Sequence, residues 1–220
     1  MRTIRVTGKG RIRVKPDMTR ITLSLEGIYP EYGETLRRSS QDTERLKDLL
    51  AGFGFERSDL KTLNFSVDTE YENYKDKGTY RQRFVGYKFS HTMKVEFESD
   101  NEKLGKVLYA LANCDVKPEF RLSDTVKDPE AAKNELLGRA VSDAGEKALV
   151  LSKAAGVTLK EIQSSAYSWG QIDFEIQPMN RMLMAKGCCD EAMAEAGYDL
   201  DIEPDDIEVS DTGTVIWEIA

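Results

Sequence analysis

The sequence predicts an α+β fold in which helices pack on a mainly antiparallel sheet. Several long stretches alternate apolar and polar residues, as strands do, and three others carry apolar residues at helical spacing. The order ββ-α-ββ-α-β-α-β-β lacks the regular βαβ rhythm of a parallel sheet. With 220 residues, 40% of them hydrophobic and 32% charged, the chain is long enough for one core and has a globular composition. We therefore predict a single domain over residues 1–220.

The first strand is predicted over residues 4–14, with one buried and one basic face. The even positions are Ile4, Val6, Gly8, Gly10, Ile12 and Val14. The odd positions are Thr3, Arg5, Thr7, Lys9, Arg11, Arg13 and Lys15. Glycines inside a strand favour a bend or bulge, which we expect at Gly8 and Gly10. Pro16-Asp17 then predicts a turn, and the alternation of Ile21, Leu23 and Leu25 predicts the other half of a hairpin.

A helix and a long hairpin are predicted next. Residues 32–50 have helical spacing, and Gly52 and Gly54 end the helix. The side of the helix expected to be buried carries Leu36, Thr43, Leu46, Leu49 and Leu50. Alternation returns over residues 63–71 and 85–97, on either side of a polar segment at residues 73–82. Such a pair of strands is too extended for its own sheet to cover, so we predict a protruding hairpin.

The second half of the chain adds two helices and the closing strands. Asp100 caps a helix that reaches Leu111, and a short strand follows near residues 120–122. Asp128-Pro129 begins a third helix, whose alanine-rich stripe suits close packing on a sheet and which Gly156 ends. Strands are expected at residues 162–168 and, as one strand or a bulged pair, at residues 207–219. Residues 170–200 lack a clear period, and we predict a mobile, partly helical insertion there.

Charge is distributed unevenly along the chain. The net charge is −8, which argues against a nucleic-acid partner. Residues 187–220 carry −11 and contain no Lys or Arg, whereas residues 1–186 carry +3 and are most basic in the first twenty residues. Two solvated faces would explain this asymmetry. Alternatively the two ends attract each other, within a chain or between subunits. The candidate interaction surface comprises Arg5, Lys9, Arg11, Arg13, Asp205, Asp206 and Glu208.

The sequence offers no convincing metal, cofactor or catalytic site. Cys114, Cys188 and Cys189 are odd in number and form no Cys-x-x-Cys pair, so we expect free thiols and no bound metal. The single histidine, His91, lies in register with Phe89 and Met93 and has no carboxylate at a telling spacing. A hydrogen-bonded, partly buried histidine is the preferred interpretation, with a catalytic pair as the alternative. Free thiols and the absence of an apolar leader in this sequence predict a cytoplasmic protein, or an exported one if the chain has been trimmed.

Blocks spread over nearly the whole chain resemble the SIMPL-domain family, which is named for a kinase-interacting signalling protein. The blocks are Val6-Thr7-Gly8-Lys9-Gly10, Pro16-Asp17 with Ile21 and Leu23, Asp59-Leu60-Lys61-Thr62, Gly86-Tyr87, Ala140-Val141-Ser142-Asp143-Ala144, Lys147-Ala148, Ala155-Gly156-Val157 and Ile207-Glu208-Val209. The resemblance implies an α+β fold and ring- or channel-like oligomers, which are often periplasmic and linked to stress or antigenicity. It implies no catalytic residue that can be assigned here.

Two functional interpretations follow. The first is a non-enzymatic, oligomeric assembly or interaction protein whose long hairpin and charged ends meet other subunits or a protein partner. The resemblance implies a stress-related role for it. The second is a small-molecule-binding protein or hydrolase with a pocket under residues 170–200. A convergent set of polar residues would favour the second interpretation, and the sequence contains none.

Overall fold

The computed structural model describes residues 2–76, 79–167, 174–176 and 203–220. The chain divides into two compact units, each made of separate stretches. Unit 1 comprises Met1–Asp17, Asp124–Ile176 and Pro204–Ala220, and unit 2 comprises Met18–Ser123 and Gln177–Glu203. A single domain over residues 1–220 stays a prediction. Cys188, Cys189 and most of the predicted insertion at residues 170–200 lie outside the described residues.

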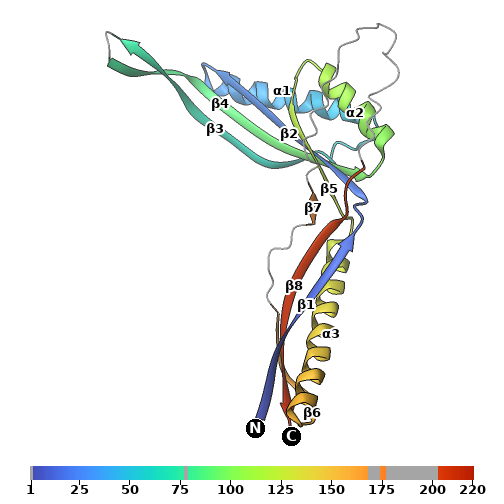
Figure 1. The fold of residues 1–220 in the computed structure, drawn as a ribbon. Helices are drawn as coiled ribbons and strands as arrows, with labels where there is room; N and C mark the ends of the chain where they lie inside the picture. Colours follow the sequence, from blue (N-terminus) through green and yellow to red (C-terminus); the bar gives the residue numbers. More distant parts are fainter. Residues whose placement is uncertain (1, 77–78, 168–173, 177–202) are drawn as a thin grey trace. The chain divides into compact units, whose positions relative to one another are not determined.

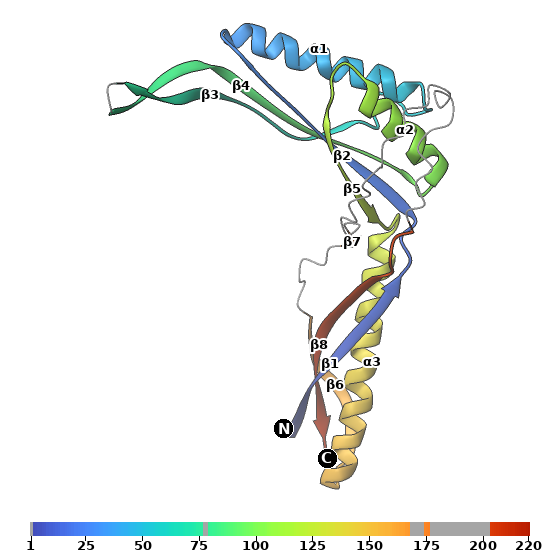
Figure 2. The same cartoon turned by 45° about the horizontal axis from the view of Figure 1, so that its top comes forward.

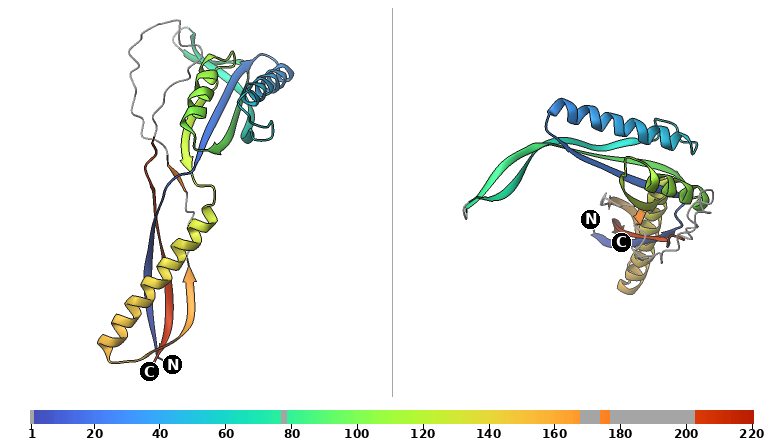
Figure 3. Two further views of the ribbon diagram at one scale, coloured as in Figure 1. Left: turned by 90° about the vertical axis from the view of Figure 1, so that its right-hand side faces the viewer. Right: turned by 90° about the horizontal axis from the view of Figure 1, so that it is seen from above.

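Unit 1 is a three-stranded antiparallel sheet with one long helix, α3 (Pro129–Ala155), beside it (Figure 2). The strand order is β1 (Arg2–Val14), β8 (Ile207–Ile219) and β6 (Leu159–Tyr167). The N- and C-terminal ends of the chain therefore lie side by side, as the views in Figure 3 show. One uninterrupted strand, β8, takes the place of the bulged pair that was the alternative for residues 207–219.

The hairpin partner and the bulge expected for the first strand are both wrong. β1 pairs with β8, whereas β2 (Met18–Tyr29) pairs with β4, so β1 and β2 do not form a hairpin. The β1–β8 register runs without a shift from Arg2 opposite Ile219 to Val14 opposite Ile207, so the glycines mark no bulge. Their role is to let α3 approach: a Cβ atom on Gly8 would lie under 3.0 Å from the carbonyl oxygen of Ala140.

The predicted features of α3 explain its packing. The carboxylate of Asp128 accepts a hydrogen bond from the amide of Ala131 at 2.9 Å, and Pro129 occupies the first turn. Gly156 ends the helix in the left-handed conformation with φ of 68°. Ala140, Ala144 and Ala148 are completely buried along the stripe that faces the sheet. Small side chains on the helix and glycines on the strand together permit the close approach.

Unit 2 contains the larger core. Its strands follow the order β3 (Lys61–Asp76), β4 (Thr79–Glu98), β2 and β5 (Glu119–Thr125), and the last two residues of β5 pair in unit 1 with β7 (Glu175–Ile176). Two helices, α1 (Tyr32–Ala51) and α2 (Asn101–Asn113), contribute Leu46, Leu50, Leu104 and Leu108 to one cluster with Ile21, Leu23, Leu25, Phe89, Met93 and Val95 of the strands. The predicted α+β class, the antiparallel pairing and the long hairpin are confirmed.

The hairpin of β3 and β4 continues past the first residues of α1 (Figures 1 and 3). The two strands pair as far as Asp76, which lies opposite Thr79. They therefore extend into residues 73–82, which the sequence predicted to be a polar connecting segment. No helix in the described part of the chain has both the length and the apolar composition needed to cross a membrane.

Candidate interaction surfaces

Four aromatic side chains form a continuous row on unit 2, where the hairpin leaves the cover of α1. Tyr32 begins the helix, Tyr87 and Phe84 belong to β4, and Tyr71 belongs to β3. Successive rings meet edge to face, with centroids 5.4 Å apart for Tyr32–Tyr87 and Phe84–Tyr87, and 5.7 Å for Tyr71–Phe84. We call these four residues the aromatic row.

The aromatic row is unusually exposed for so many rings in contact. Tyr32, Tyr71 and Phe84 have exposed fractions of 50%, 51% and 46%. Tyr87 lies next to the core, where its carbonyl oxygen accepts a hydrogen bond from the hydroxyl of Thr35 at 3.4 Å. The row thus continues the apolar face of the sheet beyond the end of the helix. Contiguous exposed apolar surface of this kind marks interaction sites.

The strand that carries Tyr71 also has an open edge. Among the described strands, β3 is the outermost of its sheet over all 16 residues. It contains no proline, and register shifts occur only between Thr62 and Asn64 and between Glu70 and Tyr71. A long edge strand presents unpaired backbone groups to another chain. The surface of β3 therefore offers both an apolar and a backbone contact.

The predicted basic face exists on unit 1, and β8 brings one acidic residue to it. Arg5, Lys9, Arg11 and Arg13 are exposed at alternate positions of β1. Arg13 forms an ion pair with Glu208, its partner in the β1–β8 register. Asp205 and Asp206 are exposed just before β8. Within the described ranges, the side chains of Arg5, Lys9 and Arg11 have no ion-pair partner.

Two α3 residues that the sequence did not single out as partners of β1 hold its outer edge. The amide of Lys9 donates a hydrogen bond to the carboxylate of Asp143 at 2.6 Å, and the guanidinium of Arg139 donates to the carbonyl oxygen of Arg11 at 3.0 Å. Lys147, and secondarily the amide of Lys9, lower the pKa of Asp143. Arg139 and Asp143 are spaced i, i+4, which places them on the same side of the helix, and this spacing could have identified them in the sequence. Because α3 occupies this edge, β1 is a poor site for adding another strand.

His91 belongs to the buried interior of unit 2, with an exposed fraction of 8%. Its Nδ1 lies 3.1 Å from the hydroxyl of Thr43 on α1, and its Nε2 lies 2.9 Å from the hydroxyl of Thr62 on β3. The ring of Phe65 packs edge-on at 5.2 Å. Both ring nitrogens bind threonine hydroxyls, so the hydrogen-bonded, buried interpretation is confirmed and a His–carboxylate pair is not formed.

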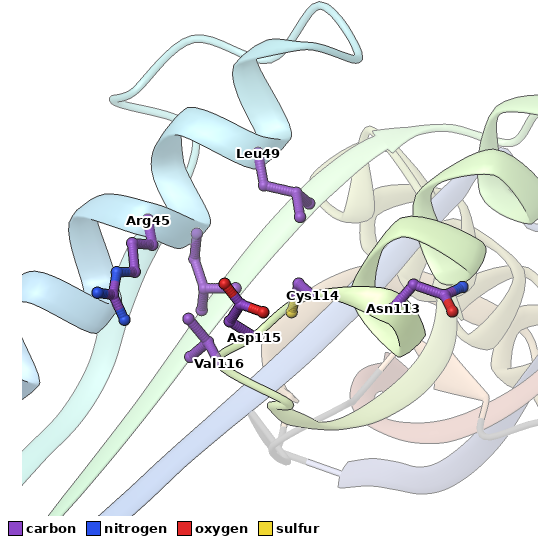
Figure 4. A pocket seen from close by; sticks show the side chains of 7 residues that line it. Arg45, Leu49, Asn113, Cys114, Asp115 and Val116 are labelled. Carbon is purple, nitrogen blue, oxygen red and sulfur yellow. The ribbon is translucent and has the colours of Figure 1, made fainter.

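A shallow cavity of about 330 Å³ lies between the end of α1 and the residues after α2 (Figure 4). Its lining residues are Arg45, Leu46, Leu49, Asn113, Cys114, Asp115 and Val116. The thiol of Cys114 is free and lies 3.1 Å from the carbonyl oxygen of Leu111, to which it donates a hydrogen bond. Arg45 is engaged with Asp42 at 3.3 Å. The thiol of Cys114 therefore donates to a backbone carbonyl oxygen and not to a carboxylate base of this set. The pocket proposed under residues 170–200 lies outside the described residues.

Comparison with known proteins agrees with the resemblance. A 26 kDa periplasmic immunogenic protein from Brucella melitensis biotype 1 is 28% identical over 160 residues, and the protein of that name from Brucella abortus (strain S19) is equally identical. The aligned region covers 72% of this chain and 64% of those relatives. The solved structure of CutA from Synechococcus elongatus PCC7942 covers 59% of this chain and is itself covered to 95%, at 13% identity. Its TM-score of 0.21 is too low to indicate a shared fold.

The family comparison spans both units. The SIMPL family, whose description reads "protein of unknown function (DUF541)", matches residues 4–217. That range includes β1, the long hairpin, α3 and nearly all of β8. The chain therefore belongs to the SIMPL family.

Proposed function

We propose that this protein is a non-enzymatic assembly protein, and that copies associate through the distal part of the β3–β4 hairpin. The observation that carries the proposal is the aromatic row, in which successive rings are in contact while three of the four are about half exposed. Tyrosine and phenylalanine supply large contact area at a small cost in side-chain entropy. The open edge of β3 adds backbone hydrogen-bonding groups at the same place.

Amide hydrogen exchange at two protein concentrations tests the location of the contact. In a concentrated sample, we expect slower exchange over residues 69–76 and 79–87 than in a dilute one, because pairing shields these backbone groups from water. Amides of α3 serve as the internal control and should exchange equally in both samples. Equal exchange of the hairpin at both concentrations would show that it is not the contact.

The Brucella relatives are named as periplasmic proteins. We propose the same compartment for this chain, which favours the exported alternative over the cytoplasmic one. We also propose that the two units act together as one SIMPL domain, since the family match includes both.

A second contact is proposed between the basic face of β1 and acidic residues before and within β8. Lys9 and Arg11 project from neighbouring positions of one face, about 7 Å apart, so they repel each other, and Arg5 adds a third positive charge farther along the same face. The exposed carboxylates of Asp205 and Asp206 on another copy would reduce that repulsion. Exposed pairs contribute only about 0–1 kcal/mol each, so the effect should concern assembly more than folding.

An Arg5→Glu, Arg11→Glu double variant tests this contact, because it leaves the ion pair of Arg13 with Glu208 within the chain intact. We expect a lower assembly mass than that of the parent at low salt, and a smaller difference at 1 M salt, where the Debye length is about 3 Å. The readouts are mass by light scattering and melting temperature. Equal values for variant and parent at low salt would mean that the two charged regions are only solvated faces.

A further inference from the structure

His91 is a buried titratable group that the proposed assembly does not use, and its proton arrangement can be derived from its neighbours. The hydroxyl of Thr43 donates to the carbonyl oxygen of Ser39 at 2.8 Å. Having no second proton, that hydroxyl must accept a hydrogen bond from the ring, so Nδ1 carries the hydrogen. Nε2 is then the acceptor for the hydroxyl of Thr62. The neutral ring links α1 to both strands of the hairpin.

A second proton would change this arrangement. Protonated Nε2 would become a donor, so the hydroxyl of Thr62 would have to rotate and accept a hydrogen bond from the ring in place of donating one. Two further neighbours are apolar: Phe65 on β3, and Leu25 opposite on β2. The ammonium group of Lys47 on α1 also acts on the ring, and its positive charge disfavours the protonated form of His91. Burial is the main cause that lowers the pKa of His91, and Lys47 adds to it.

We propose that His91 is a proton-sensitive latch, which holds α1 on the β3–β4 hairpin while its ring is neutral and loosens it when the ring is protonated. This inference does not depend on the assembly contact. In an unfolded or locally opened chain the ring titrates near about 6.5. Above that pH the ring is neutral in both states, and the latch is closed. As pH falls below about 6.5, the opened state binds a proton more readily than the closed one, so closure weakens.

Because His91 is the single histidine of the chain, one signal reports its titration directly. We expect the NMR resonances of its ring in the unmodified protein to titrate below about 6.5, in step with a rise in the opening of residues 39–50 measured by hydrogen exchange. Between pH 7.5 and 5.5, opening should increase by up to about tenfold after correction for intrinsic exchange rates, the limit for a ring that titrates only when opened. Amides of α3 should show no such increase.

Two variants separate the latch from general acid sensitivity. His91→Gln keeps an amide donor and acceptor but cannot be charged, so its α1 opening should not change over this pH range. Lys47→Gln removes the repelling ammonium, so its increase should be smaller than that of the parent. A His91 ring that titrates at or above about 6.5 overturns the proposal, as does an equal pH response in the parent and His91→Gln. If His91→Gln does not fold, the ring titration and α1 exchange of the parent still decide the outcome.

Discussion

Replacing Gly8 by alanine should lower the free energy of unfolding of unit 1 by about 3 kcal/mol. The new Cβ atom would lie under 3.0 Å from three atoms of α3, the carbonyl oxygen of Ala140, the amide nitrogen of Ala144 and its Cβ. Two of these belong to the helix backbone, which cannot move away as a flexible side chain could. The strand or α3 must therefore shift and lose close packing, at a cost at the upper end of that for overpacked cores. Urea unfolding followed by the fluorescence of buried Trp217 measures the change.

Gly138→Ala is the matched control for this prediction, because it makes the same substitution on the exposed side of α3. No atom lies within 4 Å of a Cβ at Gly138. Alanine has the higher helix propensity, so this variant should gain up to about 1 kcal/mol. If Gly8→Ala also stabilises unit 1, or leaves it unchanged, the close approach of α3 to β1 is wrong.

The second large effect is expected from Tyr71→Ser combined with Phe84→Ser. The two rings meet at 5.7 Å and are about half exposed, so their loss removes apolar contact area while leaving the cluster around Phe89 and Met93 intact. We expect the mass of the assembly to fall toward 24.8 kDa. The melting temperature of the double variant should remain close to that of the parent measured at a dilution at which the parent is monomeric. Mass is measured by light scattering and melting by circular dichroism.

Tyr80→Ser provides the comparison. Tyr80 belongs to the same hairpin and is the most exposed of its aromatic residues at 76%, but it is not part of the aromatic row. Its removal should lower the assembly mass much less than loss of the row does, because Tyr80 lies in the contact segment but outside the row. Equal loss of mass in both variants would mean that general hydrophobicity of the hairpin, rather than the row, drives association.

Local signals in the sequence determined most of the elements. Asp128, Pro129 and Gly156 set the limits of α3, and Asp100 caps α2 by accepting hydrogen bonds from the amides of Glu102 and Lys103. Alternation identified the long strands because each buries one face. These signals act within a few residues, so they can be detected without knowledge of the tertiary structure.

Strand partners could not be predicted in the same way. Adjacent strands usually pair, which favoured a hairpin of β1 and β2, but β1 pairs instead with β8 from the other end of the chain. Helical periodicity also misplaced Leu36 on the buried side of α1. The sheet there contacts Thr35 and Ser39, which are nearly fully buried, and leaves Leu36 exposed. Long-range packing decides both outcomes, and no local spacing encodes it.

The interaction surface was only partly visible in the sequence. The length of the hairpin and the basic face of β1 could both be predicted from the sequence. The aromatic row was not, because its residues come from three elements and a register shift between Glu70 and Tyr71 alters the facing of the strands beyond it. Gly86 adjoins this shift, and a Cβ there would lie under 3.0 Å from the carbonyl oxygen of Tyr29. Backbone proximity thus accounts for glycines in two of the blocks that resemble the family.

The mass of the unmodified protein in solution tests the central claim of assembly most directly. Light scattering over a range of concentrations should give a mass that is a multiple of 24.8 kDa at the highest concentration and falls on dilution or stays constant. A single species of 24.8 kDa at every concentration, at low salt and neutral pH, would contradict the account.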